Sequence, residues 1–511
     1  MKKSRILTLV IAFVLIVSSF TAYAGEGADD AGKTVTVGTM MANTSMDHMA
    51  TPGGIAFELV FEGLYDVDPD TNEIVPRIAA EMPEQVDDVT YRIKLKENVT
   101  FSDGTPLTAE DILYSYRRMG SDNCKEKATY SIFDFDNCVA EDDHTVVLKT
   151  FEPNGNVMNA ISALADIVSK DFYETVSDAD LWDKTCGTGP YIIEENVSGS
   201  HYKLTLREDY WDKDAMPDVQ TFIIKSYTEM STMYTDFANG TIDLIMGLNE
   251  SNTNHLLEGE VANATVMTVP TFAVDYLILP EDVEVLQDVR VREAIAIAID
   301  WADVVDNAYG SLGSVATSML PSNSPYYKNE GAFEYDPDRA IELLAEAGFE
   351  NGLELNVLST SDTSAIRIHE TIQAYLAGVG ITMNFQTQET SALMPSIAMG
   401  GASDMFVLMC MSAPSVGTPS QVFLHANDDS PLVTCQINDP EYNVLWDNFG
   451  SALTEEAKKD AAYALQDWHK ENIRYIPIGE KNYAYAYNNV KIAKATLTCE
   501  ANAELRFIKL N

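Results

Sequence analysis

The segment FSDGTPLTAEDILYSYRRM (residues 101–119) decides the local fold, because it joins a turn to the start of a helix. Asp103-Gly104-Thr105-Pro106 has turn chemistry, since Asp tolerates a turn backbone and Gly and Pro interrupt regular structure. Thr108 precedes Asp111 by three residues, which is the spacing of a capping box, and an acidic group in the first turn complements the helix dipole. The pattern predicts a helix that begins after Thr108.

The same segment also holds a serine, several carboxylates and a tyrosine pair, which is the composition of an active site. Three apolar residues follow the cap at helical spacing and give the helix one apolar face: Ile112, Tyr116 and Met119. Each polar group that suggests catalysis is accounted for by the turn or the cap. We therefore interpret the segment as structural.

The first residues, MKKSRILTLVIAFVLIVSSFTAYAGEGADD, have the pattern of a secretory signal peptide. Basic residues precede an apolar run of about 15 residues, and Ala22-Tyr23-Ala24 is a small-x-small cleavage site. The run is shorter than the ~20 residues of a spanning helix. We expect residues 1–24 to be removed and an exported chain to begin at Gly25. The first cysteine is Cys124, so no lipobox is present at the cleavage point.

Length and charge narrow the class of protein. The chain exceeds what one hydrophobic core usually supports, so roughly three domains or lobes are expected. Lys plus Arg number 33 and Asp plus Glu number 79, which gives a net charge of −46. This charge repels nucleic acids and anionic lipids, and excludes both as main partners. We interpret it as a solvated acidic surface, the alternatives being attraction of cationic solutes or salty surroundings.

Six cysteines occur in this exported chain, where disulfides can form and persist: residues 124, 138, 186, 410, 435 and 499. Their pairing cannot be deduced from sequence. The best candidate is Cys124 with Cys138, because the residues between them could form a hairpin. No cysteines have the close spacing of zinc ligands, and no His-x-x-x-His occurs. We expect no structural metal and no cofactor.

Helices alternate with short apolar strands along the chain, which favours an α/β fold with parallel or mixed sheets. A strand is predicted at 34–38, a strand or hairpin at 89–101, and an apolar helical segment at 55–67. Further helices are predicted within 226–247, 286–300 and 335–349. The last has Asp336 at its cap, Pro337 in its first turn and Gly348 past its end. No repeat or Gly/Ser/Pro linker separates independent domains, so interwoven lobes are expected.

Common signatures of hydrolases and nucleotide-binding proteins are missing. The sequence has no G-x-S-x-G elbow, no H-E-x-x-H and no G-x-G-x-x-G. A Ser, His and Asp that meet only in space would leave no such signature.

Several segments, in a fixed order, resemble the peptide/nickel class of solute-binding proteins that serve ABC importers, which includes dipeptide- and oligopeptide-binding proteins. They cover nearly the whole mature chain: IVPRIAAEMPEQVDDVTYRIKLKENVTFSDGTPLTAEDILYSYRRM (74–119), GTGPYIIEENVSGSHYKLTLREDYWD (187–212), LQDVRVREAIAIAID (286–300), SMLPSNSPYY (318–327), YDPDRAIELLAEAGF (335–349) and WHKENIRYIPIGEKNYAYAYNNV (468–490).

The resemblance implies an α/β, two-lobed periplasmic-binding-protein-like fold with mixed sheets and a ligand cleft between the lobes. Lobe one is expected from residues 25–270, with a subdomain inserted at about 60–185, and from a return at 485–511. Lobe two is expected from residues 271–484. The lobes would close on the ligand by a hinge motion and be recognised by a membrane permease.

The sequence departs from the family where dipeptides are held. Dipeptide binders carry an acidic residue in a loop after a strand, where it pairs with the peptide's amino terminus. Here the strand is SDMFVLMC (403–410), and no carboxylate occurs between Met411 and Gln421. The family's arginine for the peptide carboxylate is matched only by Arg367, inside a predicted helix. Since a charged terminus buried without its partner costs several kcal/mol, a simple zwitterionic dipeptide is not the expected ligand.

The resemblance assigns candidate ligand-binding residues by position: Thr39, Met40, Met41, Asn43, Tyr276, Met411, Ser412 and Ser415. The methionines have core filling as their alternative role, but several in one loop beside a polar Asn indicate an adaptable ligand wall. The two serines around Pro414 have turn formation as their alternative role.

The sequence thus predicts an extracytoplasmic solute-binding protein, not an enzyme, that delivers a short peptide or related amphipathic solute to an ABC-type permease. The alternatives are a ligand-presenting sensor or chaperone on the same fold, and a binder of a metal chelate or oligosaccharide. A secreted hydrolase comes last. We expect a monomer, and a periplasmic one, because a binding protein without an anchor would otherwise diffuse away.

Overall fold

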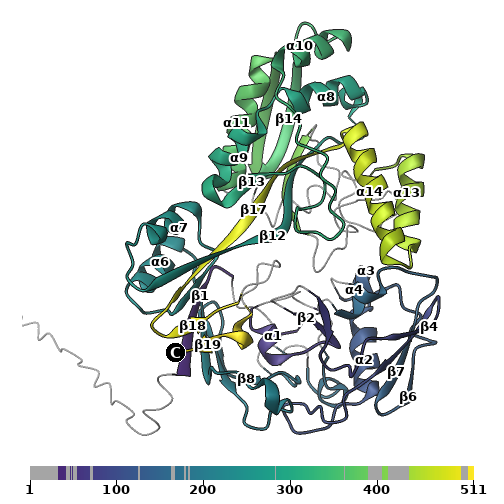
Figure 1. Ribbon diagram of the computed structural model, residues 1–511, viewed down its shortest axis with the longest axis vertical. Coiled ribbons are helices and arrows are strands. Elements are labelled where there is room, and N and C mark those ends of the chain that lie inside the picture. The colour runs from purple at the N-terminus through teal and green to yellow at the C-terminus, as the bar shows by residue number, and fades with distance from the viewer. Residues whose placement is uncertain are drawn as a thin grey trace, which may run out of the picture.

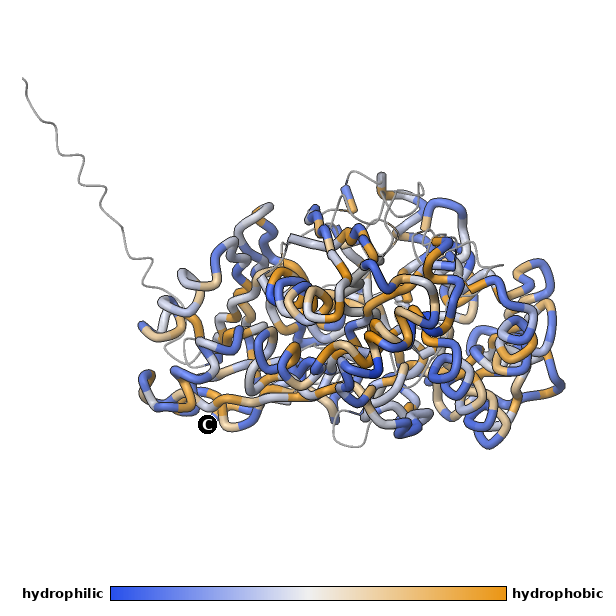
Figure 2. Tube along the Cα trace, turned by 90° about the horizontal axis from the view of Figure 1, so that it is seen from above, coloured by the Kyte–Doolittle hydropathy of each residue, from blue (hydrophilic) through white to orange (hydrophobic). Residues whose placement is uncertain are grey.

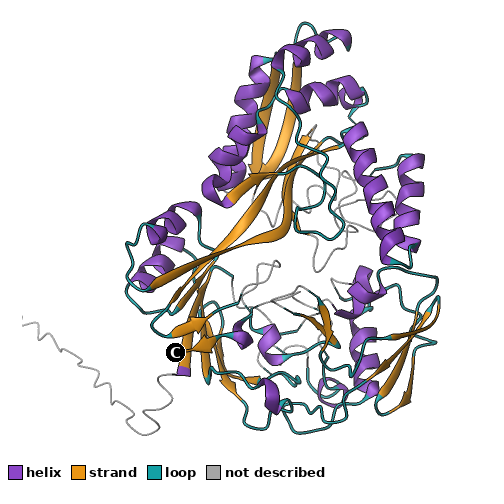
Figure 3. Ribbon diagram, viewed as in Figure 1, coloured by secondary structure: helices purple, strands orange, loops and turns teal. Residues whose placement is uncertain are grey.

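The structure is a computed structural model. It describes residues 33–41, 46, 47, 49, 55–68, 73–124, 127–162, 167–177, 180, 181, 184–281, 283–361, 363–388, 405–412, 437–496 and 504–511, and for 405–412 the backbone alone. Helices and strands are intermixed throughout these ranges (Figure 3). The predicted signal peptide lies outside the described residues.

One mixed sheet runs through both halves of the molecule (Figure 1). Its order is β15-β14-β16-β12-β17-β11-β1-β10-β9-β8, with β13 beside β17. The strands are β1 Thr34–Thr39, β8 Tyr191–Val197, β9 His201–Leu206, β10 Thr221–Ser226, β11 Leu244–Met246, β12 Ala264–Ile278, β13 Gly313–Val315, β14 Leu353–Thr360, β15 Ile381–Gln388, β16 Met405–Ser412 and β17 Tyr475–Asn488. The β1 strand is parallel to β10 and β11, and β14 is parallel to β15 and β16. The other neighbours are antiparallel.

The long strands β12 and β17 belong to both halves. They pair from Ala264↔Asn488 to Ile278↔Tyr475. At one end β17 also pairs with β11, and at the other end β12 pairs with β16. We call the half with β1 and β8–β11 lobe one, and the half with β13–β16 lobe two. The predicted boundaries at 270/271 and 484/485 fall inside these two strands and stay predictions.

A second, antiparallel sheet lies apart from the main one and forms the inserted subdomain with α2 (Figure 1). Its order is β4-β5-β7-β6. The strands are β4 Glu84–Asp87, β5 Thr90–Lys94, β6 Val139–Asp142 and β7 Thr145–Lys149. Two smaller pairs, β2 Tyr65–Val67 with β3 Ile74–Pro76 and β18 Ile492–Lys494 with β19 Lys509–Leu510, belong to lobe one and its border with the subdomain.

Helices cover the sheets. In lobe one and the subdomain they are α1 Phe57–Val60, α2 Ala109–Met119, α3 Lys127–Tyr130, α4 Val157–Ser162, α5 Lys170–Tyr173, α6 Met230–Ala238 and α7 Glu250–Leu257. In lobe two they are α8 Val289–Ile297, α9 Trp301–Tyr309, α10 Pro337–Glu346, α11 Thr363–Gly378, α13 Pro440–Ser451 and α14 Glu455–Asn472. Within the described part of the chain, no helix is long and apolar enough to cross a membrane.

The predicted helix starts are confirmed. Asp111 Oδ2 accepts hydrogen bonds from the N and Oγ1 of Thr108, both at 2.9 Å, and α2 begins at the next residue. Asp336 caps α10, with Pro337 in its first turn. The helix expected across 55–67 is wrong in extent: α1 has four residues, and the chain then turns so that Glu62 faces Arg77 at 2.5 Å.

Hydrophobic side chains fill several cores. One core lies between helices α8–α11 and the strands of lobe two. Another lies in the subdomain around α2, and a third lies in lobe one behind β1 and β10. Seen from above, hydrophobic positions concentrate in the interior segments and hydrophilic positions along the outer loops (Figure 2).

Candidate ligand-binding site

The first predicted residues lie where β1 ends, at the edge of lobe one. Thr39 is buried; its carbonyl accepts a hydrogen bond from Tyr227 N at 2.9 Å, and its Oγ1 accepts one from Met41 N at 3.1 Å. Met40 and Met41 are 41% and 51% exposed. This loop therefore presents two adaptable apolar side chains. Asn43 lies outside the described residues.

The helix of the opening segment holds the continuation of this loop. A nitrogen of the Arg118 guanidinium lies 2.8 Å from Asp47 Oδ1, and the guanidinium also lies over the ring of Tyr173, 5.0 Å from its centroid. Asp47 is 7% exposed. The segment 101–119, whose polar groups form a turn and a helix cap, thus also positions the loop after β1 through Arg118.

The structure describes the predicted residues of lobe two to different extents. Met411 and Ser412 end β16, where their backbones pair with Val274 and Ala273 of β12; their side chains, and Ser415 altogether, lie outside the described residues. Tyr276 is fully buried, and its hydroxyl donates to the carbonyl of Met319. The structure therefore places Tyr276 in the core of lobe two.

The main sheet brings the predicted residues of both lobes to one region. Between Thr39 on β1 and Met411 on β16 lie β11, β17 and β12. At about 4.8 Å per strand, four spacings separate the two by roughly 19 Å across the sheet, and they are also displaced along β17, because β11 pairs near Tyr485 and the row of Met411 crosses β17 at Glu480. The β17–β12 pair thus spans the space that the two predicted walls border.

The β12 strand is irregular in this region. Its register with β17 shifts between Pro270 and Val274, and again between Asp275 and Tyr276. Pro270 has no N–H to donate, and its carbonyl accepts a hydrogen bond from Asn323 Nδ2 at 3.2 Å instead. Bulges of this kind bend a strand and redirect side chains. These register shifts lie between β12 and β17, the two strands that connect the lobes. A hinge motion between the lobes would act in these strands.

Two buried carboxylates flank this irregularity. Glu480 is 7% exposed and accepts hydrogen bonds from Ser322 N at 3.1 Å and Ser322 Oγ at 2.6 Å. Burial raises the pKa of Glu480, and the Ser322 hydrogen bonds oppose the shift. Asp275 is 4% exposed and accepts a hydrogen bond from the Tyr309 hydroxyl. Neither carboxylate is among the predicted residues, although a Glu within the apolar strand YIPIGE (475–480) is a signal in the sequence.

The lobes also meet on the side away from these strands. Gly155, just before α4 of the subdomain, donates from its N to Gly450 O at 3.1 Å and accepts from Lys458 Nζ at 2.9 Å. Lys458 is 7% exposed and lies near the rings of Tyr326 and Phe449. A Cβ on Gly155 would lie 2.2 Å from Ala452 O. The contact thus requires glycine, a requirement that the sequence alone did not reveal.

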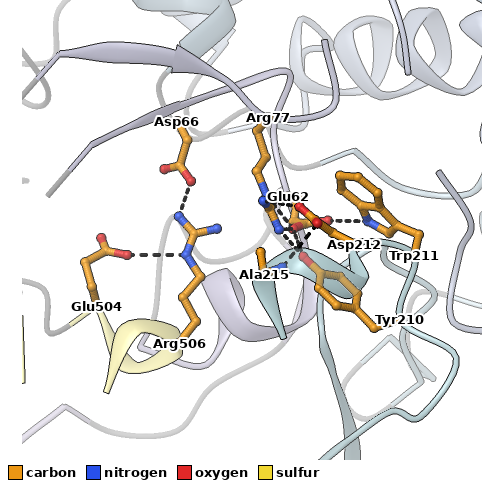
Figure 4. Close-up of polar contacts among 9 residues, drawn as sticks. All are labelled: Glu62, Asp66, Arg77, Tyr210, Trp211, Asp212, Ala215, Glu504 and Arg506. Carbon is orange, nitrogen blue, oxygen red and sulfur yellow. Dashed lines mark hydrogen bonds and ion pairs between the residues drawn. The ribbon is translucent and has the colours of Figure 1, made fainter. Parts of the chain in front are cut away.

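The buried ion pairs of lobe one form a separate cluster (Figure 4). Glu62, whose side chain is fully buried, accepts hydrogen bonds from Arg77 Nε, the Tyr210 hydroxyl and Trp211 Nε1 at 2.7, 2.7 and 2.9 Å. Arg77 also pairs with Asp212 at 3.0 Å. Beside them, Arg506 pairs with Asp66 and Glu504. Since these charges satisfy one another, the cluster is structural.

A small hollow opens elsewhere on lobe two, between the loop that follows β13 and the end of α14. Glu330, Phe333 and His469 are among its lining residues. Met319 and Tyr475, which also line it, contact the buried ring of Tyr276, but none of the predicted ligand residues is itself a lining residue. No group of three or more His, Cys, Asp and Glu suited to a metal ion is found in the described residues.

The predicted disulfide is not present. Cys124 and Cys138 are both buried in the subdomain and no disulfide joins them. The Cys138 sulfur instead lies against Lys149 of β7, whose backbone N donates to it at 3.2 Å. Cys186 is also buried without a disulfide. Packing rather than a covalent link orders this part of the subdomain.

Comparison with known proteins fits this geometry. The family model "Bacterial extracellular solute-binding proteins, family 5 Middle" matches residues 73–430. A Brucella ovis protein named as an ABC transporter peptide-binding protein is 25% identical over 462 residues, covering 86% of this chain and 84% of its own. The match spans well over half of the chain, so the chain belongs to the family 5 bacterial extracellular solute-binding proteins, and the predicted membership is confirmed.

Solved structures share the fold. The ABC transporter substrate-binding protein CtaP of Listeria monocytogenes has a TM-score of 0.83 at 20% identity, covering 93% of this chain and 99% of its own. The oligopeptide-binding protein AppA of Bacillus subtilis, solved with a nonapeptide, has a TM-score of 0.78 at 20% identity and covers 94% of this chain and 99% of its own. The two-lobed binding-protein fold is therefore confirmed.

Proposed function

We propose that this chain binds a short peptide or a related amphipathic solute between its lobes and delivers it to an ABC-type permease from outside the cytoplasm. The observation that carries the proposal is the arrangement of the β17–β12 pair. These two strands connect the lobes, are irregular in register, and pass between the exposed methionines after β1 and the end of β16. A binding protein that closes around its ligand needs such a connection.

Peptides are favoured by the relatives. The Brucella protein is named for peptides and AppA of Bacillus subtilis was solved with a nonapeptide. Exposed methionines suit ligands of varied side chains, because the thioether is flexible and polarisable. Membership of a family of extracellular solute-binding proteins supports a carrier in the periplasm and not an enzyme, and we expect the carrier to be a monomer.

Thermal unfolding of residues 25–511 tests the proposal. Separate panels of di- to pentapeptides, oligosaccharides, metal chelates and small cations would be added to the same preparation. A ligand at about 100 times its dissociation constant contributes about 2.7 kcal/mol, which moves the midpoint by several degrees. A shift with the peptide panel supports the proposal. A shift with oligosaccharides or chelates alone would replace peptide by that ligand class, and hydrolysis of the added peptides would contradict a carrier role.

A further inference from the structure

We propose that Glu480 binds a positively charged group of the ligand, and that the ligand is recognised through this charge without any requirement for a carboxylate. The inference rests on the proposed function, because it assigns a ligand chemistry to the same space between the lobes.

Glu480 is a buried carboxylate whose interactions in the described residues include no cation, in contrast to three buried carboxylates elsewhere in the molecule. Glu62 pairs with Arg77 at 2.5 Å, Asp47 with Arg118 at 2.8 Å and Asp243 with Lys491 at 2.7 Å. In the described part of the chain, Glu480 has Ser322 as its hydrogen-bonding partner and no lysine, arginine or histidine. An ionised carboxylate offers about four acceptor positions, so about half of those on Glu480 stay available.

Burial of an ionised carboxylate without a cation costs free energy, and this cost falls when a cation binds beside the carboxylate. The neighbouring Lys481 does not supply one. Alternate residues of a strand point to opposite faces, and the Lys481 ammonium lies on the Tyr309 side of β17, 6.0 Å from the ring centroid. Glu480 instead shares its face with Val274, its partner across the strands, and with the Ser322 loop.

Glu480 lies in the same row of the main sheet as the end of β16. Its partner Val274 also pairs with Met411 at the end of β16. The three residues therefore form one row across β17, β12 and β16. Ser322, which covers the carboxylate, is itself exposed. A ligand group seated against the end of β16 would lie about two strand spacings, roughly 10 Å, from Glu480 Cα. The extended Glu480 side chain and an ammonium group of the same ligand could together span this distance.

The predicted walls carry no positive charge. No lysine or arginine occurs from Thr34 to Pro76, a range that includes β1 and the loop after it. None occurs between Arg367 and Lys458, a range that includes β15, β16 and the segments around them. A ligand carboxylate would find no guanidinium or ammonium on either wall, whereas a ligand cation would find Glu480. The expected ligand therefore carries an ammonium or guanidinium group, from a peptide amino terminus or from a basic side chain.

Four tripeptide libraries test this on the whole mature chain. All are built from Ala, Ser, Leu and Phe: one with free termini, one amidated at the carboxyl end, one capped at both ends, and one capped at both ends that contains a single lysine. Thermal unfolding and titration calorimetry give the midpoint shift and the affinity. We expect the free and amidated libraries to bind equally well, and the doubly capped uncharged library to bind at least about tenfold more weakly. Binding of the lysine library would identify a side chain as the source of the charge, and its failure would identify the amino terminus.

Glu480→Gln tests the residue. It should weaken binding of the amidated library about 10- to 100-fold and leave the doubly capped library unchanged. Ser322→Ala, which keeps the carboxylate, should keep the preference for charged libraries, and near-ultraviolet circular dichroism checks that both variants fold. If the free library binds the wild type and Glu480→Gln alike, or if the doubly capped library binds as well as the amidated one, this inference is overturned and the proposed function stands. If no library binds the wild type, the proposal of a peptide ligand fails, and this inference fails with it.

Discussion

Gly155 and Lys458 join the two lobes through a hydrogen bond of 2.9 Å from the lysine Nζ to the glycine carbonyl. The two residues belong to the inserted subdomain and to α14, and they meet on the side of the molecule away from the strands that connect the lobes (Figure 1). The lobes are therefore connected covalently by β12 and β17, and the contact at Gly155 adds a noncovalent link on the opposite side. We expect the second contact to form when the lobes close.

Gly155→Ala should weaken this closed arrangement. The added methyl group would lie 2.2 Å from Ala452 O, a backbone atom that cannot move alone. Small-angle scattering should show a larger radius of gyration than the wild type in the presence of the peptide panel, and ligand affinity should fall by about tenfold or more. Gly450→Ala is the matched control, because its methyl group meets open space across the same contact. Equal scattering curves for Gly155→Ala and the wild type would contradict the closing role.

Asp111→Ala should destabilise the subdomain by about 2–3 kcal/mol, since a buried carboxylate that satisfies several donors is lost. Its oxygens accept from Thr108 N, Thr108 Oγ1 and Lys170 N, each at 2.9 Å. Urea unfolding monitored by circular dichroism measures the loss. Glu110→Ala, at the exposed neighbouring position, should change stability by less than about 0.5 kcal/mol. A comparable loss in both variants would show that the cap is unimportant.

Arg77→Met should cost about 3–5 kcal/mol, because Glu62 would remain buried without its cation. The control is Arg92→Met, whose partners Glu84 and Glu141 are exposed, and which should cost less than about 1 kcal/mol. Denaturant titrations of both variants make the comparison. If Arg77→Met unfolds at the wild-type denaturant concentration, the cluster of Figure 4 is not a structural ion-pair network.

Glu330 should make stability depend on pH. Burial, and then the nearby Asp467, raise the pKa of Glu330 from 4.5 to about 7, while Lys328 at 3.6 Å acts in the opposite direction. The folded chain thus keeps a proton that the unfolded chain releases, so this contribution to stability is complete below pH 4.5 and is lost as pH rises to about 7.

Glu330→Gln, which mimics the protonated group, should lose less stability across that window than the wild type, by about 1 kcal/mol after allowance for solvent screening. Unfolding titrations at both ends of the window measure the difference. Glu350→Gln, at an exposed position, should follow the wild type. Parallel stability curves for Glu330→Gln and the wild type would contradict the assignment.

Local chemistry made much of the fold predictable. The caps at Thr108 and Asp336 each start a helix where the sequence indicated, because a cap is a short-range arrangement of side chain and backbone. The extent of α1 was not predictable: the 55–67 segment has a helical pattern, but the buried Glu62 needs Arg77, which belongs to a different element. The tertiary ion pair between Glu62 and Arg77 thus determined the end of α1 in spite of the helical periodicity of the sequence.

The site was less predictable than the fold. Thr39, Met40 and Met41 do lie at the edge of lobe one, since the end of a strand can be read from its pattern. Tyr276 is a core residue, because whether a position in a long strand faces the core or a ligand depends on the register of β12 with β17. Glu480 and Gly155 depend on contacts between segments more than 150 residues apart. The sequence pattern does not encode such contacts.

Native mass spectrometry of residues 25–511, incubated with an equimolar mixture of free-terminus tri- to pentapeptides, tests the central claim most directly. The account predicts a complex of one chain with one peptide. A spectrum of the free chain alone in the peptide mixture, with a complex formed by an oligosaccharide or chelate instead, would contradict it.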